Sequence, residues 1–156
     1  MNTAMSGRIG IISDTHGLYR NEVDSVFRGV DLVVHAGDIG KRTILTRLQS
    51  IAPVMAVRGN VDHDYWTDEL EYELFFEKWD VSFFVIHDRE QLDMDPGAAG
   101  IDVVIFGHSH KPFIKKKNGV FYINPGSAGP RRFSLPITVA TLKIDREKLH
   151  PELHYL

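Results

Sequence analysis

Short apolar runs alternate with helix-like segments through the first third of the chain. Unbroken apolar runs predict buried strands, and apolar residues that recur at helical spacing predict amphipathic helices. A repeated strand–helix order predicts parallel strands that are joined by right-handed crossovers. The predicted strands cover residues 8–13, 31–36 and 53–57, and the predicted helices cover residues 21–29 and 41–50.

The pattern changes after residue 60, where strands replace helices. Asn118-Gly119 is a strong signal for a two-residue hairpin, and residues 138–144 alternate well enough to pair with residues 149–156. We therefore expect an antiparallel second half and, overall, an α/β fold of two mixed β-sheets packed face to face with helices outside. The other predicted strands cover residues 70–76, 81–86, 103–106, 113–117 and 120–123.

Length and composition limit the classes of protein that the chain can belong to. With 156 residues and no linker, it is expected to form one domain over residues 1–156, with residues 1–6 frayed. The net charge of −3 argues against nucleic acid as a partner, and the absence of cysteine excludes thiolate metal sites and cysteine nucleophiles. No apolar run is long enough for a signal peptide or a membrane span, so we expect a cytoplasmic protein with no membrane partner.

Five predicted strands each end in a small polar cluster. Because ligands bind beyond the carboxyl ends of strands in α/β sheets, we expect these clusters to meet in one site. In Asp-x-His and His-x-His, an extended backbone would point both side chains the same way. The neighbouring glycines allow tight turns. The clusters are Asp14-Thr15-His16, Gly37-Asp38, Gly59-Asn60, His87-Asp88 and Gly107-His108-Ser109-His110.

Seven side chains in these clusters are of the types that bind metal ions in proteins. A mixed set of imidazole, carboxylate and amide suits Mn²⁺, Fe, Zn²⁺ or Co²⁺ better than Mg²⁺, which prefers oxygen. Seven ligands are too many for one tetrahedral zinc but suit two ions roughly 3.5–4 Å apart, with one carboxylate bridging them. The seven candidate ligands are Asp14, His16, Asp38, Asn60, His87, His108 and His110.

The ordered series of motifs resembles the calcineurin-like metallophosphoesterase superfamily. The short chain and the loop Asn124-Pro125-Gly126-Ser127 resemble its small, cap-less bacterial and archaeal phosphodiesterase branch, and the retromer subunit Vps29 shares that fold. The resemblance runs from about Ile9 to Ile144. It implies a four-layer αββα sandwich, with a dinuclear metal site at the carboxyl-terminal edge of the strands and a small phosphate ester as substrate.

The resemblance also implies a role for each candidate ligand. Asp38 would bridge two divalent ions, with Mn²⁺ expected and Ni²⁺, Zn²⁺, Fe or Co²⁺ as alternatives. A metal-bridging hydroxide would attack phosphorus in line, and Asn60 would donate a hydrogen bond to a phosphoryl oxygen. Asp38 and Asn60 are thus the implied catalytic residues. The other implied ligands are Asp14, His16 and His110 for the first metal, and Asn60, His87 and His108 for the second.

Two departures from the family pattern concern the substrate. Many relatives carry a histidine directly after the Gly-Asn pair, where it is thought to protonate the leaving group, but this chain has Val61. Asp62, His63 or a metal-bound water are the alternatives for that role. Many relatives also read His-Gly-His at the fourth of these clusters, whereas this chain reads His87-Asp88-Arg89. Metal binding should survive this change, but substrate preference is open.

Other polar residues carry weaker signals. His35 lies inside an apolar strand and is expected to be a hydrogen-bonded core residue. Arg131 and Arg132 follow a Gly/Pro-rich loop and are candidate phosphate-binding residues, because guanidinium pairs bidentately with phosphate. A surface pair is the equally weighted alternative. Lys115-Lys116-Lys117 is interpreted as a solvated hairpin tip.

Two further functions stay open beside the phosphodiesterase. A Vps29-like protein-binding scaffold has the same fold without catalysis, although it has no need of seven intact ligands. A phosphomonoesterase, nucleotidase or protein phosphatase is the third candidate, and monoesters usually need more cationic contacts. An exposed aromatic face would be compatible with a homo-oligomer.

Overall fold

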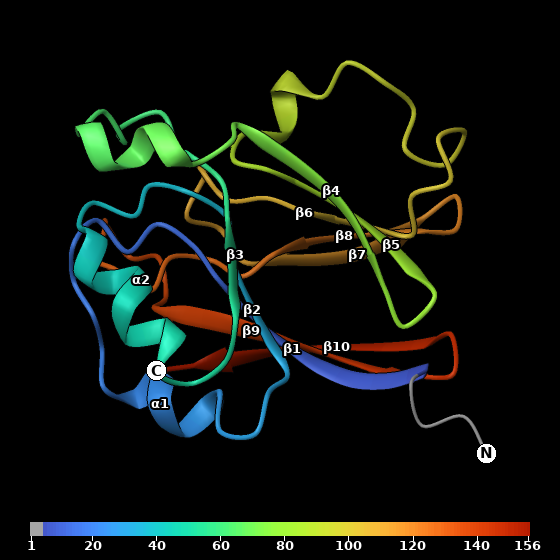
Figure 1. Ribbon diagram of the computed structural model, residues 1–156, viewed down its shortest axis with the longest axis horizontal. Helices are drawn as coiled ribbons and strands as arrows, with labels where there is room; N and C mark the ends of the chain where they lie inside the picture. Colours follow the sequence, from blue (N-terminus) through green and yellow to red (C-terminus); the bar gives the residue numbers. More distant parts are fainter. Residues whose placement is uncertain (1–4) are drawn as a thin grey trace.

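Two five-stranded sheets form the framework of the computed structural model, which describes residues 5–156. Figure 1 shows them stacked, with the sheet that contains β4–β8 above the sheet that contains β1, β9 and β10. The expected two mixed sheets are therefore confirmed. The expected fraying of residues 1–6 falls mainly on residues 1–4, which lie outside the described residues. Ser6 already belongs to β1 and pairs with Asp145.

The first sheet has the order β10-β9-β1-β2-β3. β1, β2 and β3 are parallel, as the strand–helix alternation predicts, and β9 pairs antiparallel with both β1 and β10. The predicted pairing of the last two strands is confirmed. The strands are β1 (Ser6–Ile12), β2 (Leu32–His35), β3 (Val54–Ala56), β9 (Thr138–Asp145) and β10 (Lys148–Tyr155).

The second sheet has the order β4-β5-β6-β8-β7 and corrects the expectation of an antiparallel second half. β5, β6 and β8 are parallel, because the chain recrosses the sheet between them, and only the outer strands β4 and β7 run antiparallel to their neighbours. The Asn118-Gly119 hairpin is confirmed, with both residues at positive φ. The strands are β4 (Glu73–Lys78), β5 (Val81–Ile86), β6 (Val103–Ile105), β7 (Phe113–Lys117) and β8 (Val120–Asn124).

The main core fills the space between the sheets. Ile11 and Leu142 from the first sheet and Phe83 and Ile105 from the second are fully buried there. On the outer face of the first sheet, helices α1 (Glu22–Val26) and α2 (Arg42–Gln49) contribute Val23, Phe27, Ile44 and Leu48 to a second cluster. This gives the αββ part of the predicted sandwich.

The fourth layer is thinner than the other three. The outer face of the second sheet is covered by the 3-10 turn η3 (Arg89–Gln91) and the yellow loop that leads to β6 (Figure 1). α1 is shorter than predicted, and the 3-10 helix η2 (Tyr65–Glu69) was not predicted. No helix among residues 5–156 is long and apolar enough to cross a membrane.

His35 lies at the end of β2 and is fully buried, as expected of a core residue. Its Nδ1 accepts a hydrogen bond from the Gly37 amide (3.1 Å), so the proton is on Nε2, which lies 3.0 Å from the Thr15 hydroxyl. The Thr15 hydroxyl donates in turn to the Ile39 carbonyl (2.9 Å). Burial lowers the pKa of His35 to about 4, so a neutral imidazole joins the loops after β1 and β2.

His35 should make stability depend on pH. Since its folded-state pKa is depressed from 6.5 to about 4, the unfolded chain takes up this proton more readily. The stability contribution is complete above pH 6.5 and is lost as pH falls from 6.5 towards 4. Between pH 7.5 and pH 5 the loss should be about 2 kcal/mol.

Urea unfolding at both pH values, in the presence of chelator, measures this loss. His35→Gln should be less stable at pH 7.5 and should lose this part of the pH dependence, whereas His150→Gln on the exposed face of β10 should keep it. An unchanged pH dependence in His35→Gln would contradict the assignment.

Candidate metal centre

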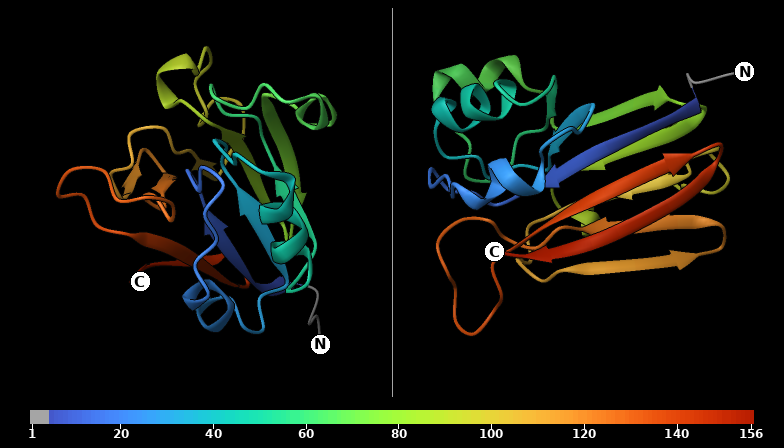
Figure 2. Two further views of the ribbon diagram at one scale, coloured as in Figure 1. Left: turned by 90° about the vertical axis from the view of Figure 1, so that its left-hand side faces the viewer. Right: turned by 90° about the horizontal axis from the view of Figure 1, so that it is seen from below.

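The seven candidate ligands come together at one end of the molecule. They lie on the loops that follow β1, β2, β3, β5 and β6, all of which end at the same edge. The right-hand view of Figure 2 shows the helices and the orange 125–137 loop at one end, with the strands extending away from it. The predicted convergence of the five motifs is therefore present in the structure.

At five of the seven candidate ligands the backbone is left-handed rather than extended. The φ angles are 57° at Asp14, 46° at His16, 57° at Asp38, 74° at His108 and 61° at His110. The expectation of an extended Asp-x-His segment was therefore wrong, although both side chains reach the site. Left-handed φ is uncommon for residues with a side chain, and such strain gathers at functional sites.

Close approach of the loops explains two of the glycines. At Gly37, φ is +102° and an added Cβ would lie 2.6 Å from His87 Nδ1. At Gly59, a Cβ would overlap the backbone amide and carboxylate of Asp38. A side chain at Gly37 would push the second cluster away from the third and the fourth, and a side chain at Gly59 would push the third cluster away from the second.

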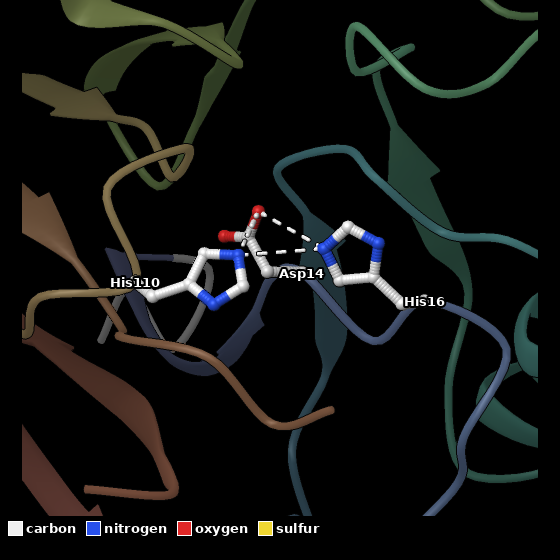
Figure 3. Close-up of side chains that lie close together, drawn as sticks. All are labelled: Asp14, His16 and His110. Carbon is white, nitrogen blue, oxygen red and sulfur yellow. Dashed lines mark hydrogen bonds and ion pairs between the residues drawn. The ribbon is translucent and has the colours of Figure 1, made fainter. Parts of the chain in front are cut away.

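The first group of ligand atoms surrounds one oxygen of Asp14 (Figure 3). Asp14 Oδ1 lies 4.0 Å from His16 Nε2 and 3.4 Å from His110 Nε2, and these two nitrogens are 3.4 Å apart. Asp14 is fully buried. Its other oxygen, Oδ2, accepts hydrogen bonds from the Ser13 hydroxyl (2.8 Å) and the His108 amide (3.2 Å). Oδ1 is therefore aimed at the two imidazoles.

A second group forms around Asp38. Its Oδ2 lies 3.2 Å from His87 Nε2 and 3.8 Å from His16 Nε2, while its Oδ1 accepts from the Val61 amide at 3.1 Å. One carboxylate oxygen thus stands between a histidine of the first group and a histidine of the second. Asp14 Oδ1 is also 3.9 Å from His87 Nε2, so both aspartates link the two groups.

Asn60 and His108 complete the site on the side of His87. The imidazoles of His87 and His108 meet edge to face with their centroids 5.3 Å apart, and His108 Nδ1 lies 3.2 Å from Asn60 Oδ1. The other nitrogen of His108 faces the Asp88 carboxylate at 3.8 Å. Asp88 thus lies behind His108 rather than among the ligand atoms.

The charges in the site are coupled. Burial would lower the pKa of His87, but the carboxylates of Asp38 and Asp14 raise it above its usual value. Burial would likewise raise the pKa of Asp38, but His87, the Val61 amide and His16 hold it below its usual value. The pKa of His16 is lowered, mainly by burial.

The donor set fits divalent cations. Among residues 5–156, the buried atoms Asp14 Oδ1 and His87 Nε2 have no hydrogen-bond partner, and buried polar atoms rarely stay unpaired. The Nδ1 of His87 lies 2.7 Å from the Ala36 carbonyl, an arrangement that leaves Nε2 for a metal. Ligand atoms lie within 4.8 Å of one another in two groups: Asp14, His16 and His110, and Asp14, Asp38 and His87.

Two supporting residues were not identified from the sequence. Asp62 is buried, and its carboxylate accepts hydrogen bonds from the amides of Ile39, Gly40 and Gly59 at 2.9–3.2 Å. Asn124 is also buried and donates to the Gly107 carbonyl (3.0 Å). Both hold site loops in place. In the sequence, each is a polar residue close to a glycine motif. That pattern does not distinguish a residue that holds a loop by hydrogen bonds from one that takes part in the reaction.

Val61 and the two residues that follow it differ in exposure and in hydrogen bonding. Val61 is 45% exposed at the edge of the site, whereas the carboxylate of Asp62 is committed to backbone amides, and His63 is exposed. Of the two candidate arginines, Arg131 donates to the Leu135 carbonyl within its own loop. Arg132 lies near enough to His16 for its charge to help lower the pKa of that imidazole.

Comparison with known proteins identifies the family. Residues 8–147 match the model of the calcineurin-like phosphoesterase superfamily domain. The chain belongs to this superfamily. A probable metallophosphoesterase of Methanothermobacter thermautotrophicus is 39% identical over 158 residues, which cover 93% of this chain and 90% of that protein. The family predicted from the five motifs is confirmed.

Solved structures of the superfamily agree with the fold. A novel archaeal phosphodiesterase superposes with a TM-score of 0.81 at 27% identity, covering 96% of this chain and 99% of that one. Vps29 of Entamoeba histolytica, complexed with zinc, superposes with a TM-score of 0.76 at 21% identity, covering 96% and 98%. The second likeness concerns the fold alone.

Asp14→Asn tests the metal centre apart from catalysis. The amide keeps the hydrogen bonds of Oδ2 but removes the buried charge, so Mn²⁺ affinity should fall by more than about 100-fold, beyond the 10–100-fold typical of outer-shell partners. The metal-free protein should be at least as stable, because an unpaired buried charge is lost. Calorimetric titration and thermal unfolding in chelator measure both effects.

Asp102→Asn is the matched control for this substitution. Asp102 accepts a hydrogen bond from the Ser82 amide, between β5 and β6 and away from the candidate ligands, so its variant should bind Mn²⁺ like the wild type. Wild-type affinity in Asp14→Asn would contradict the role given to Asp14.

Proposed function

We propose that this chain is a metal-dependent phosphodiesterase that uses two divalent ions, with Mn²⁺ as the preferred ion. The observation that supports it best is the pair of linked ligand groups, in which Asp38 Oδ2 stands between His16 and His87. This is the position expected of a bridging carboxylate. The phosphodiesterase name of a Methanocaldococcus jannaschii relative, 27% identical over 90% of this chain and 95% of that protein, supports the same choice.

The ligand assignment follows from the two groups. Asp14, His16 and His110 would hold one ion, and Asn60, His87 and His108 would hold the other, with Asp38 shared. When bound, two such ions lower the pKa of a shared water and neutralise phosphoryl oxygens. The chain's own contribution is to fix the ligand atoms on strained, braced loops, so that little reorganisation is needed when the substrate arrives.

The substrate would be oriented by residues on both sides of the centre. Asn60 can donate a hydrogen bond to a phosphoryl oxygen through its amide, and Arg132 supplies positive charge near His16. Beside Asn60 and His108 lies a cleft of about 240 Å³ that is also lined by Tyr72 and Arg58. The Arg58 guanidinium lies 4.8 Å over the Tyr72 ring, which is 65% exposed. We assign this cleft to the ester's alcohol group.

A diester suits this site better than a monoester. A monoester carries more negative charge and usually needs more cationic contacts, whereas this cleft also presents Glu73 and Asp88.

A Vps29-like scaffold is the second candidate, since Vps29 proteins share the fold. Asp14 Oδ1, which is buried without a hydrogen-bond partner, favours a site that holds metal. Because a Vps29 protein has also been complexed with zinc, hydrolysis is the property that separates the enzyme from a scaffold. A cytoplasmic location and a homo-oligomer stay predictions.

Removal of the bridging carboxylate should abolish catalysis. With chelator-stripped protein, added Mn²⁺ should restore hydrolysis of bis-p-nitrophenyl phosphate, and Asp38→Ala should lower kcat/KM by at least 1,000-fold, about 4 kcal/mol in transition-state free energy. The exposed Asp93→Ala is the control and should retain full activity.

The same assay separates the candidate functions. Faster hydrolysis of p-nitrophenyl phosphate than of the diester would favour a monoesterase. Stoichiometric metal binding without hydrolysis of either ester would favour the scaffold. Full activity in Asp38→Ala would refute the mechanism.

The valine at position 61 leads to a prediction about how the reaction rate depends on the leaving group. Since Val61 stands where many relatives carry the histidine that is thought to protonate the leaving group, the rate should depend steeply on the pKa of the departing phenol across a series of aryl diesters. Val61→His should flatten this dependence, because the Val61 amide is anchored to Asp38 and an imidazole there would reach the site edge. Val61→Ala is the control and should keep the steep dependence. An equally steep slope in Val61→His would contradict this account of the leaving group.

A further inference from the structure

A second pocket opens on the outer face of the second sheet, apart from the seven candidate ligands. Its volume is about 450 Å³. Three of its six lining residues are cationic and none is acidic, although the chain as a whole carries a net charge of −3. The lining residues are Arg89, Phe113, Lys115, Lys117, Asn118 and Tyr122.

Strand alternation places the two lysines in the pocket. Lys115 and Lys117 point to the same side of β7 as Phe113, and Tyr122 is the partner of Lys115 across the hairpin. Lys116 faces the opposite side, where its ammonium lies 5.4 Å from the centroid of the Phe121 ring. The lysine run is exposed beside the hairpin turn, as the sequence suggests, and its side chains are divided between two faces.

Arg89 is the third cation and stands at a departure from the family pattern. Its guanidinium lies 4.9 Å from the centroid of the Phe106 ring and 5.2 Å from that of Phe113. Two aromatic rings thus hold it towards the pocket. Across the described part of the chain, no carboxylate lies within ion-pair distance of Arg89, Lys115 or Lys117.

We infer that this pocket binds a di- or polyphosphate anion. Arginine pairs with phosphate bidentately and lysine as a point charge, and the Asn118 amide and the Tyr122 hydroxyl add neutral hydrogen-bond donors. The three cations are exposed and have no ion-pair partner among the described residues, so they can bind an anion, and a single phosphate would neutralise only part of their charge. An anion with several linked phosphates suits this charge.

Two sources of such an anion fit the position. One is a free polyphosphate or nucleotide that binds apart from the metal centre. The other, which rests on the proposed function, is a remote di- or triphosphate group of the ester whose scissile phosphate would lie at the metals. Arg89 follows His87 by two residues, Phe113 follows His110 by three, and β7 then runs roughly 13 Å away from that edge.

Direct binding tests the pocket without reference to catalysis. In chelator-treated full-length protein, titration with inorganic tripolyphosphate should shift the amide resonances of Lys115, Lys117 and Asn118. The triple variant R89Q/K115Q/K117Q should bind at least tenfold more weakly. K116Q removes one positive charge of the same lysine run on the opposite face and should bind within twofold of the wild type. Absence of shifts at these residues, or wild-type affinity in the triple variant, would overturn the inference.

Kinetics distinguish the two sources. With Mn²⁺, the triple variant should raise KM at least tenfold for a dithymidylate that bears a 5′-triphosphate and leave KM unchanged for the same dinucleotide without it, and kcat should be unchanged for both. If tripolyphosphate binds but the triple variant and the wild type have equal KM values for the phosphorylated dinucleotide, the pocket belongs to a separate ligand. Tripolyphosphate binding by a protein that hydrolyses no diester would sink the proposed function and leave the pocket standing.

Discussion

A buried carboxylate oxygen without a partner is the constraint on which the site depends. Asp14 is fully buried, its Oδ2 is occupied by two hydrogen bonds, and its Oδ1 faces three imidazoles without a hydrogen bond. An unpaired buried charge costs several kcal/mol unless something compensates it. A proton on His87 compensates it in part, as the raised pKa of that imidazole indicates. Divalent cations would replace that proton and satisfy the same atoms, so the site suits ions better than it serves the protein's own stability.

Holding such a cluster together requires a rigid frame. Five of the seven candidate ligands have left-handed backbone conformations. Isolated loops would not keep this strained conformation. The neutral imidazole of His35, the carboxylate of Asp62 and the amide of Asn124 supply the hydrogen bonds that tie these loops together. The two sheets carry the loops to a common edge, and the core between them keeps the sheets in register.

The sequence was sufficient for the order of the main strands and helices and for the family. It also placed the seven candidate ligands on loops that the structure brings together, and their role as ligands stays a prediction. These depend on local patterns: apolar runs, helical spacing and polar clusters behind glycines. The parallel pairing of β5, β6 and β8 was missed, because a loop without helical periodicity makes the crossover between β5 and β6. The left-handed conformation of Asp14 and His16 and the brace made by Asp62 were missed for a related reason. Both depend on which loops lie next to each other, and that is set by tertiary packing.

Anomalous diffraction from a crystal grown with Mn²⁺ would test the central claim most directly. The account predicts two manganese peaks per chain, roughly 3.5–4 Å apart, with an oxygen of Asp38 bound to both and Asp14 bound to one. A single peak, or two peaks that do not share the Asp38 carboxylate, would contradict a dinuclear centre at this site.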